Sequence, residues 1–238
     1  LVTRRRTRPT LSKFELFILV APVLLFSMVA HEYAHGYAAL RQGDNTAQSL
    51  GRLTWNPLKH IDPVMTLIMP VITFLTIGVA FGGAKPVPVD PRNYRNYRSG
   101  DIIVSLAGIA TNLVLAILLT LLIIPLGLVG RAASGAANAL ALLQLMFLYG
   151  VVINLLLAGF NLIPIPPLDG SHVLKHLLPP KLAWQYQRFG KYGILLLVAL
   201  LWIGNGATIT WLMQPITFLQ NVAVGVVRPF VLASPWTT

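Results

Sequence analysis

The sequence contains no cysteine and few charged residues. Without cysteine the chain forms no disulfide and has no cysteine nucleophile, and any metal ligand must be histidine, aspartate or glutamate. Only 11% of the 238 residues are charged and 55% are hydrophobic, whereas a soluble domain is about 25% charged. This composition excludes an ordinary soluble domain and indicates an integral membrane protein.

The few charges are unbalanced, with seven acidic residues against 18 Lys and Arg and a formal net charge of +11. The cations lie in short segments between apolar runs and form no basic face interleaved with aromatic residues, which argues against a nucleic-acid partner. Membrane proteins gather Lys and Arg beside their spans. We therefore expect the lipid bilayer, with its anionic headgroups, to be the partner of these cations.

Long apolar runs account for most of the chain. Crossing about 30 Å of hydrocarbon takes roughly 20 helical residues. Four runs of this length lack Asp, Glu, Lys and Arg, and a fifth is interrupted only by two glutamates; the runs are 63–84, 102–130, 132–168, 192–227 and 14–40. We expect an all-α polytopic membrane protein, a single domain over residues 1–238, with about five to six transmembrane or re-entrant helices.

Turn-forming residues interrupt this pattern in three places. Residues 51–57 alternate before a proline, which predicts a short strand or hairpin after the first span. Pro70 and three glycines break the run 63–83, which favours a broken or re-entrant helix. Gly204-Asn205-Gly206 divides the last run into one span and a second segment that either crosses the bilayer or lies at its surface.

The motif His31-Glu32-Tyr33-Ala34-His35 lies inside the first apolar run. A helix places His31 and His35 one turn apart on one face, so both imidazoles can bind one Zn²⁺ while Glu32 faces the open coordination position. The alternative is a chance match, in which each histidine bonds to a neighbouring carbonyl. Three ionisable groups within five residues at membrane depth each need a polar partner or a wet cavity, which favours the metal.

A catalytic zinc ion needs a third protein ligand. We favour Asp169, the only acidic residue after Asp101, because it follows the proline-rich stretch 161–168, whose freed backbone groups require a protein-lined cavity. The alternative is that Asp169 caps the helix that follows it. The other candidates lie in or beside polar, basic or interfacial segments and need no metal: Asp44, Asp62, Asp90, Asp101, His60, His172 and His176.

Three motifs in this order, residues 31–35, 107–112 and 161–170, resemble the site-2 proteases, the zinc metalloproteases of regulated intramembrane proteolysis. The resemblance covers about residues 14–176. It implies that His31, His35 and Asp169 bind one zinc ion per chain and that Glu32 is the general base. It also implies that Asn161 holds the substrate or the oxyanion, and that residues 107–112 let the middle helix approach the site closely through Gly108. A contact between helices through small residues would explain residues 107–112 equally well, so Asn112 is a weaker candidate for a site residue.

The function implied by the resemblance is hydrolysis of peptide bonds within or next to transmembrane segments of membrane-protein substrates. The catalytic core would be about 14–176, followed by C-terminal helices at about 190–232, a short form without a PDZ or nucleotide-binding regulatory domain. Ile109 stands where many relatives have proline. The alternatives are a membrane metal-ion transporter, in which Glu32 only binds the ion, and a non-catalytic relative that binds membrane helices.

A shared metal site constrains the topology. If every apolar run crossed the bilayer, His31 and Asp169 would lie near opposite faces, whereas a re-entrant segment 63–83 brings them to the same depth. With two crossings in the last run, the side that the site faces carries twelve of the 18 cations, Arg228 among them. Because cytoplasmic loops are rich in Lys and Arg, we expect the site to open toward the cytoplasm, in the inner (plasma) membrane of a prokaryote. The cluster of four arginines within residues 4–8 argues for the opposite orientation.

Overall fold

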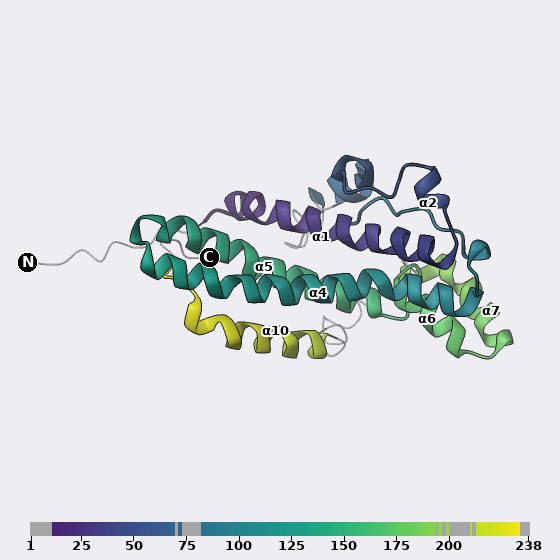
Figure 1. The fold of residues 1–238 in the computed structure, drawn as a ribbon. Coiled ribbons are helices and arrows are strands. Elements are labelled where there is room, and N and C mark those ends of the chain that lie inside the picture. Colours follow the sequence, from purple (N-terminus) through teal and green to yellow (C-terminus); the bar gives the residue numbers. More distant parts are fainter. Residues whose placement is uncertain are drawn as a thin grey trace, which may run out of the picture.

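Three long helices form the centre of the molecule. The computed structural model describes residues 11–69, 71, 72, 82–193, 195, 196, 199, 210 and 213–233. Within these residues three helical stretches are long and apolar enough to cross a membrane: α1 (Lys13–Gln42), α4 (Tyr97–Ala132) and Ser134–Leu162, which comprises η4 (Ser134–Ala136) and α5 (Ala137–Leu162). They lie side by side (Figure 1). The prediction of an all-helical membrane protein is confirmed for the described part of the chain.

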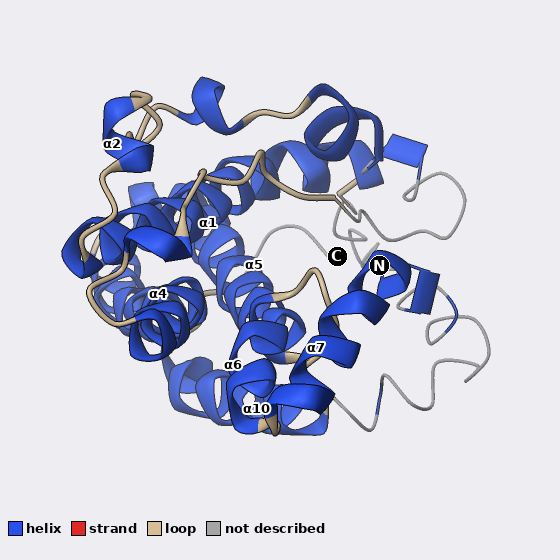
Figure 2. Cartoon of the chain, turned by 90° about the vertical axis from the view of Figure 1, so that its right-hand side faces the viewer, coloured by secondary structure: helices blue, strands red, loops and turns tan. Residues whose placement is uncertain are grey.

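Most short elements lie at one end of this bundle. α2 (Thr46–Ser49), α6 (Asp169–Leu177) and α7 (Pro180–Phe189) lie at the end where α1 stops and α4 starts, and Figure 2 shows this end facing the viewer. α10 (Gln214–Val227) runs along α4 and α5. The other helical turns are η1 (Pro57–His60), η2 (Pro63–Ile68), η3 (Pro91–Asn93), η5 (Gly190–Tyr192) and η6 (Arg228–Phe230).

The limits of α1 follow from its sequence. Ser12 and Glu15 form a capping box at its start, in which the Glu15 N–H donates to Ser12 Oγ and the Ser12 N–H donates to the Glu15 carboxylate. Gly43 ends the helix with a φ of 110°, a left-handed conformation that suits glycine. The 30 residues between them span about 45 Å. This length exceeds the hydrocarbon thickness, so the motif 31–35 lies within a helix that can cross the membrane.

The outer surface of the long helices is apolar. Such a belt is unfavourable in water and favourable against lipid tails. The exposed large apolar side chains of α1 and α4 include Phe14, Phe17, Ile18, Val114, Ile117, Leu118, Leu121 and Leu122.

The predicted strand or hairpin at residues 51–57 is wrong for these described residues, which form turns and bends. Gly51 has a φ of 62°. The N–H groups of Arg52 and Leu53 both donate to the carbonyl oxygen of Ala47, at 2.8 and 3.2 Å. These hydrogen bonds turn the segment back onto α2, so it does not extend into a ladder.

The predicted five to six transmembrane or re-entrant helices are not confirmed. The described residues provide three candidate spans, and the 14 residues of α10 are too few to cross. Residues 73–81 and most of 194–212 lie outside the described residues, so the predictions for these segments are not tested. The described ends of the run 63–83 meet: the Gly83 N–H donates to the Met65 carbonyl at 2.9 Å, and Thr66 Oγ1 donates to the Gly83 carbonyl at 2.7 Å.

Arg228 lies at the end of the bundle opposite to the one that the sequence predicts. The guanidinium of Arg131, at the far end of α4 from α6, donates to the carbonyl oxygen of Pro229. The prediction assumed two crossings in the last apolar run, whereas α10 leads η6 to the far end of α4 (Figure 1). Arg228 therefore does not belong with the cations near α2, α6 and α7.

Candidate metal centre

The two histidines of α1 are each held through Nδ1. His35 Nδ1 lies 2.7 Å from the carbonyl oxygen of Val104, and His31 Nδ1 lies 2.5 Å from Oδ1 of Asn112, both on α4. An oxygen of this kind only accepts, so each Nδ1 carries the hydrogen. In a neutral imidazole the other nitrogen is then an acceptor. Both Nε2 atoms therefore present lone pairs.

Three acceptor atoms converge between α1 and α6. The Nε2 atoms of His31 and His35 are 3.0 Å apart, and each is 3.3 Å from Oδ2 of Asp169, a buried oxygen to which no described protein group donates. Lone pairs at these separations repel unless a cation lies between them. A tetrahedral zinc site with bonds of about 2.0–2.1 Å has ligand atoms about 3.3 Å apart. The three ligand atoms and their spacing fit Zn²⁺.

Asp169 reaches this position from the first turn of α6. The residue that caps α6 is Leu168, and it makes no side-chain capping bond. The alternative in which Asp169 serves as the cap is therefore wrong. Its side chain, 19% exposed, instead points toward the two histidines.

Gly108 allows α4 to approach the histidines. A Cβ built at Gly108 would lie 2.6 Å from both His31 Cε1 and His35 Nε2. Real Cβ contacts are not that short, so any larger residue would push the imidazoles apart. The close approach expected of the middle helix is present, and it leaves room for the imidazole rings only because position 108 has no side chain.

The helix that carries Asp169 is anchored to α4 by a buried carboxylate. Asp101 contacts His172 Nδ1 at 3.3 Å, Lys175 Nζ at 2.5 Å and His176 Nε2 at 2.8 Å, all on α6. Its side chain is only 3% exposed. Asp101 lies beside a polar segment in the sequence and was expected to need no explanation, whereas the structure buries it as the anchor of α6. His172 and His176 contact this anchor and are not among the three converging acceptors. His60, also buried, has Nε2 2.9 Å from the Thr54 carbonyl oxygen, away from the three converging acceptors.

Glu32 lies beside the metal ligands in sequence and contacts another part of the chain. Its Oε2 accepts a hydrogen bond of 2.8 Å from the backbone N–H of Val87. The segment that carries Val87 is itself fixed by Arg52, which donates to the carbonyl oxygens of Lys85 and Pro86 at 3.2 Å. One carboxylate oxygen of Glu32 is therefore occupied and oriented by the backbone.

Asn161 lies near the end of α5 and makes a local contact. Its Nδ2 donates to the carbonyl oxygen of Leu157, one turn earlier, at 3.0 Å. It is not among the three converging acceptors. Asn154, about two turns earlier in α5, was not predicted from the sequence; it is fully buried and contacts Asn112.

Comparison with known proteins gives the family. The family model described as Peptidase family M50 matches residues 125–204. YwhC of Bacillus subtilis, named as a zinc metalloprotease, is 35% identical over 188 residues, which cover 79% of this chain and 82% of YwhC. The chain belongs to this site-2 protease family. Rip2 of Mycolicibacterium smegmatis, also named as a zinc metalloprotease, is 38% identical over 192 residues, 80% of this chain and 69% of Rip2.

Membership of family M50 identifies the protein as a zinc-dependent protease of the membrane. The region matched by the family model includes Asp169 but not the motif 31–35, so the histidines and the carboxylate come from separate parts of the chain that the fold unites. No solved structure matches the chain.

Proposed function

We propose that this M50 protease hydrolyses peptide bonds within or next to transmembrane segments of membrane-protein substrates, as in regulated intramembrane proteolysis. In this proposal His31, His35 and Asp169 hold one zinc ion and Glu32 is the general base. The observation that carries it is the convergence of three acceptor atoms, 3.0–3.3 Å apart, inside a bundle of apolar helices.

The depth of the site supports a substrate inside the bilayer. His31 is 18 residues from the start of α1, which corresponds to about 27 Å, and 11 residues from its end, about 16 Å. A peptide bond cleaved at this site must therefore lie in the membrane interior or at its boundary. A substrate helix must also unwind locally, because its own hydrogen bonds otherwise occupy its carbonyl groups.

Glu32 transfers the proton in this proposal. Zinc, when bound, supplies a Lewis acid that polarises the scissile carbonyl and lowers the pKa of a water molecule. Glu32 accepts the proton of that water and then gives it to the departing amine. Because Val87 occupies Oε2, the other oxygen, Oε1, is the one available to the water.

Asn161 is proposed to hold the substrate or the oxyanion. Its side-chain amide donates to the Leu157 carbonyl, which the helix already satisfies through its own backbone ladder. Turning the Asn161 side chain away from Leu157 therefore leaves no buried backbone group without a partner. This makes the amide available to a substrate carbonyl.

The proposed orientation has the site opening toward the cytoplasm. The end of the bundle that holds α2, α6 and α7 carries most of the Lys and Arg residues in the described part of the chain, whereas Lys13, Arg131 and Arg228 lie at the opposite end. The excess favours the cytoplasmic side of an inner membrane. The meeting of the ends of 63–83 supports the re-entrant topology that this orientation requires.

Cleavage of a transmembrane reporter by the purified protein tests the proposal. Wild type, Glu32→Gln and the control Glu15→Gln, which alters a carboxylate at the start of α1, are compared for zinc content and cleavage. We expect zinc in all three and cleavage lost only in Glu32→Gln. Zinc with no cleavage by any of them, and ion flux in liposomes, would instead favour a transporter.

A further inference from the structure

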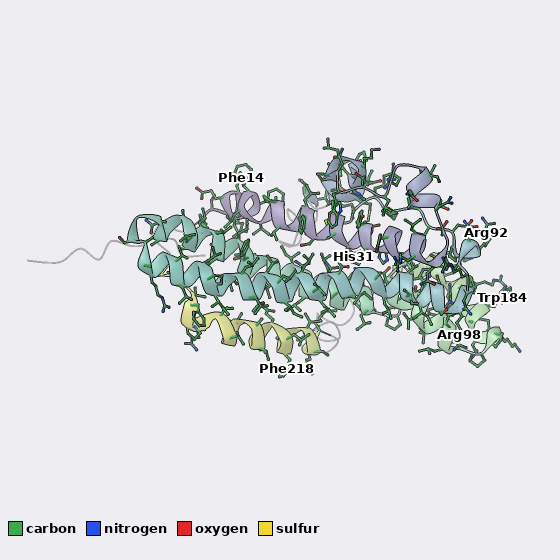
Figure 3. The ribbon with its side chains drawn as sticks, viewed as in Figure 1. Phe14, His31, Arg92, Arg98, Trp184 and Phe218 are labelled. Carbon is green, nitrogen blue, oxygen red and sulfur yellow. The ribbon has the colours of Figure 1, made fainter. Side chains whose placement is uncertain are left out.

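A line of buried polar side chains leads from His31 across the bundle. Asn112 on α4 accepts from His31 and donates through Nδ2 to Oδ1 of Asn154 on α5, at 2.8 Å. Asn154 Nδ2 donates to Ser27 Oγ, back on α1, at 2.8 Å. Ser27, Asn112 and Asn154 are fully buried. Figure 3 shows that His31, where this line begins, lies well away from the end of α1 marked by Phe14.

The direction of every hydrogen bond in this line follows from a backbone carbonyl. The terminal atom of Asn154 that faces Ser27 also lies 2.8 Å from the carbonyl oxygen of Gly150. Because a carbonyl only accepts, this atom must be the amide nitrogen, and the oxygen of Asn154 must face Asn112. Ser27 Oγ can accept from Asn154 because its own hydrogen goes to the Val23 carbonyl at 2.7 Å.

The orientation of Asn154 also determines which nitrogen of His31 carries the hydrogen. Asn112 must present its nitrogen to Asn154, so it presents its oxygen to His31. His31 Nδ1 then has to donate, and its Nε2 keeps the lone pair. In the reversed arrangement the hydrogen would lie on Nε2, pointing at the position of the metal, and the amide oxygen of Asn154 would face the oxygen of Gly150.

We infer that Asn112 and Asn154, with Ser27 at the end of the line, form a directional relay that fixes the tautomer of His31 for metal binding. Asn112 and Asn154 are thus positioning residues of the metal centre. The inference rests on the ligand set proposed above. Partners of this kind orient a metal-binding histidine, and their loss typically weakens metal binding by about 10–100-fold.

A buried amide between membrane helices can also serve only to hold the helices together. Gln144 provides a control for that role. It lies on the same helix as Asn154 and is equally buried, with Nε2 donating to the carbonyls of Ile123 and Phe230 and Oε1 accepting from the Leu232 N–H. None of these contacts leads to the histidines.

The test is the zinc affinity of the full-length purified protein, measured by competition with a chelator. We expect Asn154→Leu to weaken zinc binding by about 10–100-fold and Gln144→Leu to leave it within about threefold of wild type. Thermal unfolding of the metal-free proteins should show that both variants lose stability. A common loss of affinity in the two variants, or no loss in either, would reduce Asn154 to a packing role and overturn the relay.

A second pair of variants tests the direction of the bonds without relying on Asn154→Leu to fold. A protonated carboxyl at position 112 can accept from His31 with its carbonyl oxygen and donate its O–H to Asn154. We therefore expect Asn112→Asp to keep most of the zinc affinity that Asn112→Leu loses. Equal losses would overturn the relay, and a wild type that binds no zinc would overturn the metal centre itself.

Discussion

The carboxylate of Glu32 accepts a hydrogen bond of 2.8 Å from the backbone N–H of Val87, 55 residues later in the chain. The contact joins the proposed general base in α1 to a segment that is otherwise remote from it in sequence. No hydrogen bond from a described residue reaches the other oxygen, Oε1, and the contact restricts the direction in which Oε1 points. Orientation of the base is therefore a property of the backbone at position 87.

Proline at position 87 removes the N–H that orients Glu32. We expect Val87→Pro to lower reporter cleavage about 10-fold or more, because a misplaced base loses most of the 10²–10⁴-fold that general base catalysis contributes. Val87→Ala keeps the N–H and loses the same packing against Gly36, so it should retain much more activity. Zinc content should be the same in both. Equal activity in the two variants would show that the N–H does not matter.

A methyl group at Gly108 should abolish metal binding. The added Cβ of Gly108→Ala would lie 2.6 Å from His35 Nε2 and force the imidazoles to move. Gly135→Ala is the matched control, because a Cβ at Gly135 would meet no heavy atom of the described residues within 4 Å. Zinc per chain, measured after dialysis, should fall toward zero in the first variant and stay at wild-type level in the second. Full zinc in Gly108→Ala would contradict the close approach of α4.

Asp101→Asn should destabilise the protein by about 3 kcal/mol, the usual cost of removing one partner from a buried ion pair. The side chain of Lys175 on α6 is only 10% exposed, and the change removes the carboxylate that pairs with it. Unfolding by denaturant, monitored by circular dichroism, gives the free energy. Asp90→Asn is the comparison: that carboxylate pairs with Arg92, which is 87% exposed, and an exposed pair contributes little. Similar losses in both variants would contradict the anchoring role of Asp101.

Stability should fall in acid through Asp44, in the loop after α1. Burial acts to raise the pKa of Asp44, but hydrogen bonds from Asn93, Thr46 and the Asp90 N–H outweigh it and lower the pKa below the ordinary value of about 3.9. Because the pKa of Asp44 is lower in the folded state, its carboxylate stabilises the fold at pH values above the ordinary pKa. This contribution is lost as the pH falls through the folded-state pKa.

The comparison of wild type with Asp44→Asn checks this effect. The thermal midpoint of wild type should exceed that of the variant at pH 6, and the difference should shrink as the pH is lowered below about 4. A difference that stays constant down to the lowest pH at which the protein remains in solution would assign the effect to the shape of the side chain rather than its charge.

The grouping of His31, His35 and Asp169 in the candidate metal centre could be predicted from the sequence because the signals for it are local. The helical spacing of His31 and His35 and the isolation of Asp169 among apolar residues both appear in a linear pattern. Asn154 gives no such signal. A single amide in an apolar helix faces either lipid or a neighbouring helix, and only the packing of α5 against α1 and α4 decides which.

Two other features depended on tertiary contacts. Residues 51–57 alternate as a strand does, but without a partner strand their N–H groups bond back to α2. Asp101 lies beside a polar segment in the sequence, yet α6 packs over it and buries it. The direction in which α10 runs along α4 and α5 determines the end of the bundle at which Arg228 lies, and local sequence does not encode that direction.

Anomalous diffraction from crystals of the purified protein at the zinc absorption edge shows whether His31, His35 and Asp169 together hold one zinc ion. We expect one peak per chain, within about 2.0–2.2 Å of the two Nε2 atoms and of an Asp169 oxygen. Zinc found beside Asp101, His172 and His176 instead, or no zinc between the motif histidines and Asp169, would contradict it.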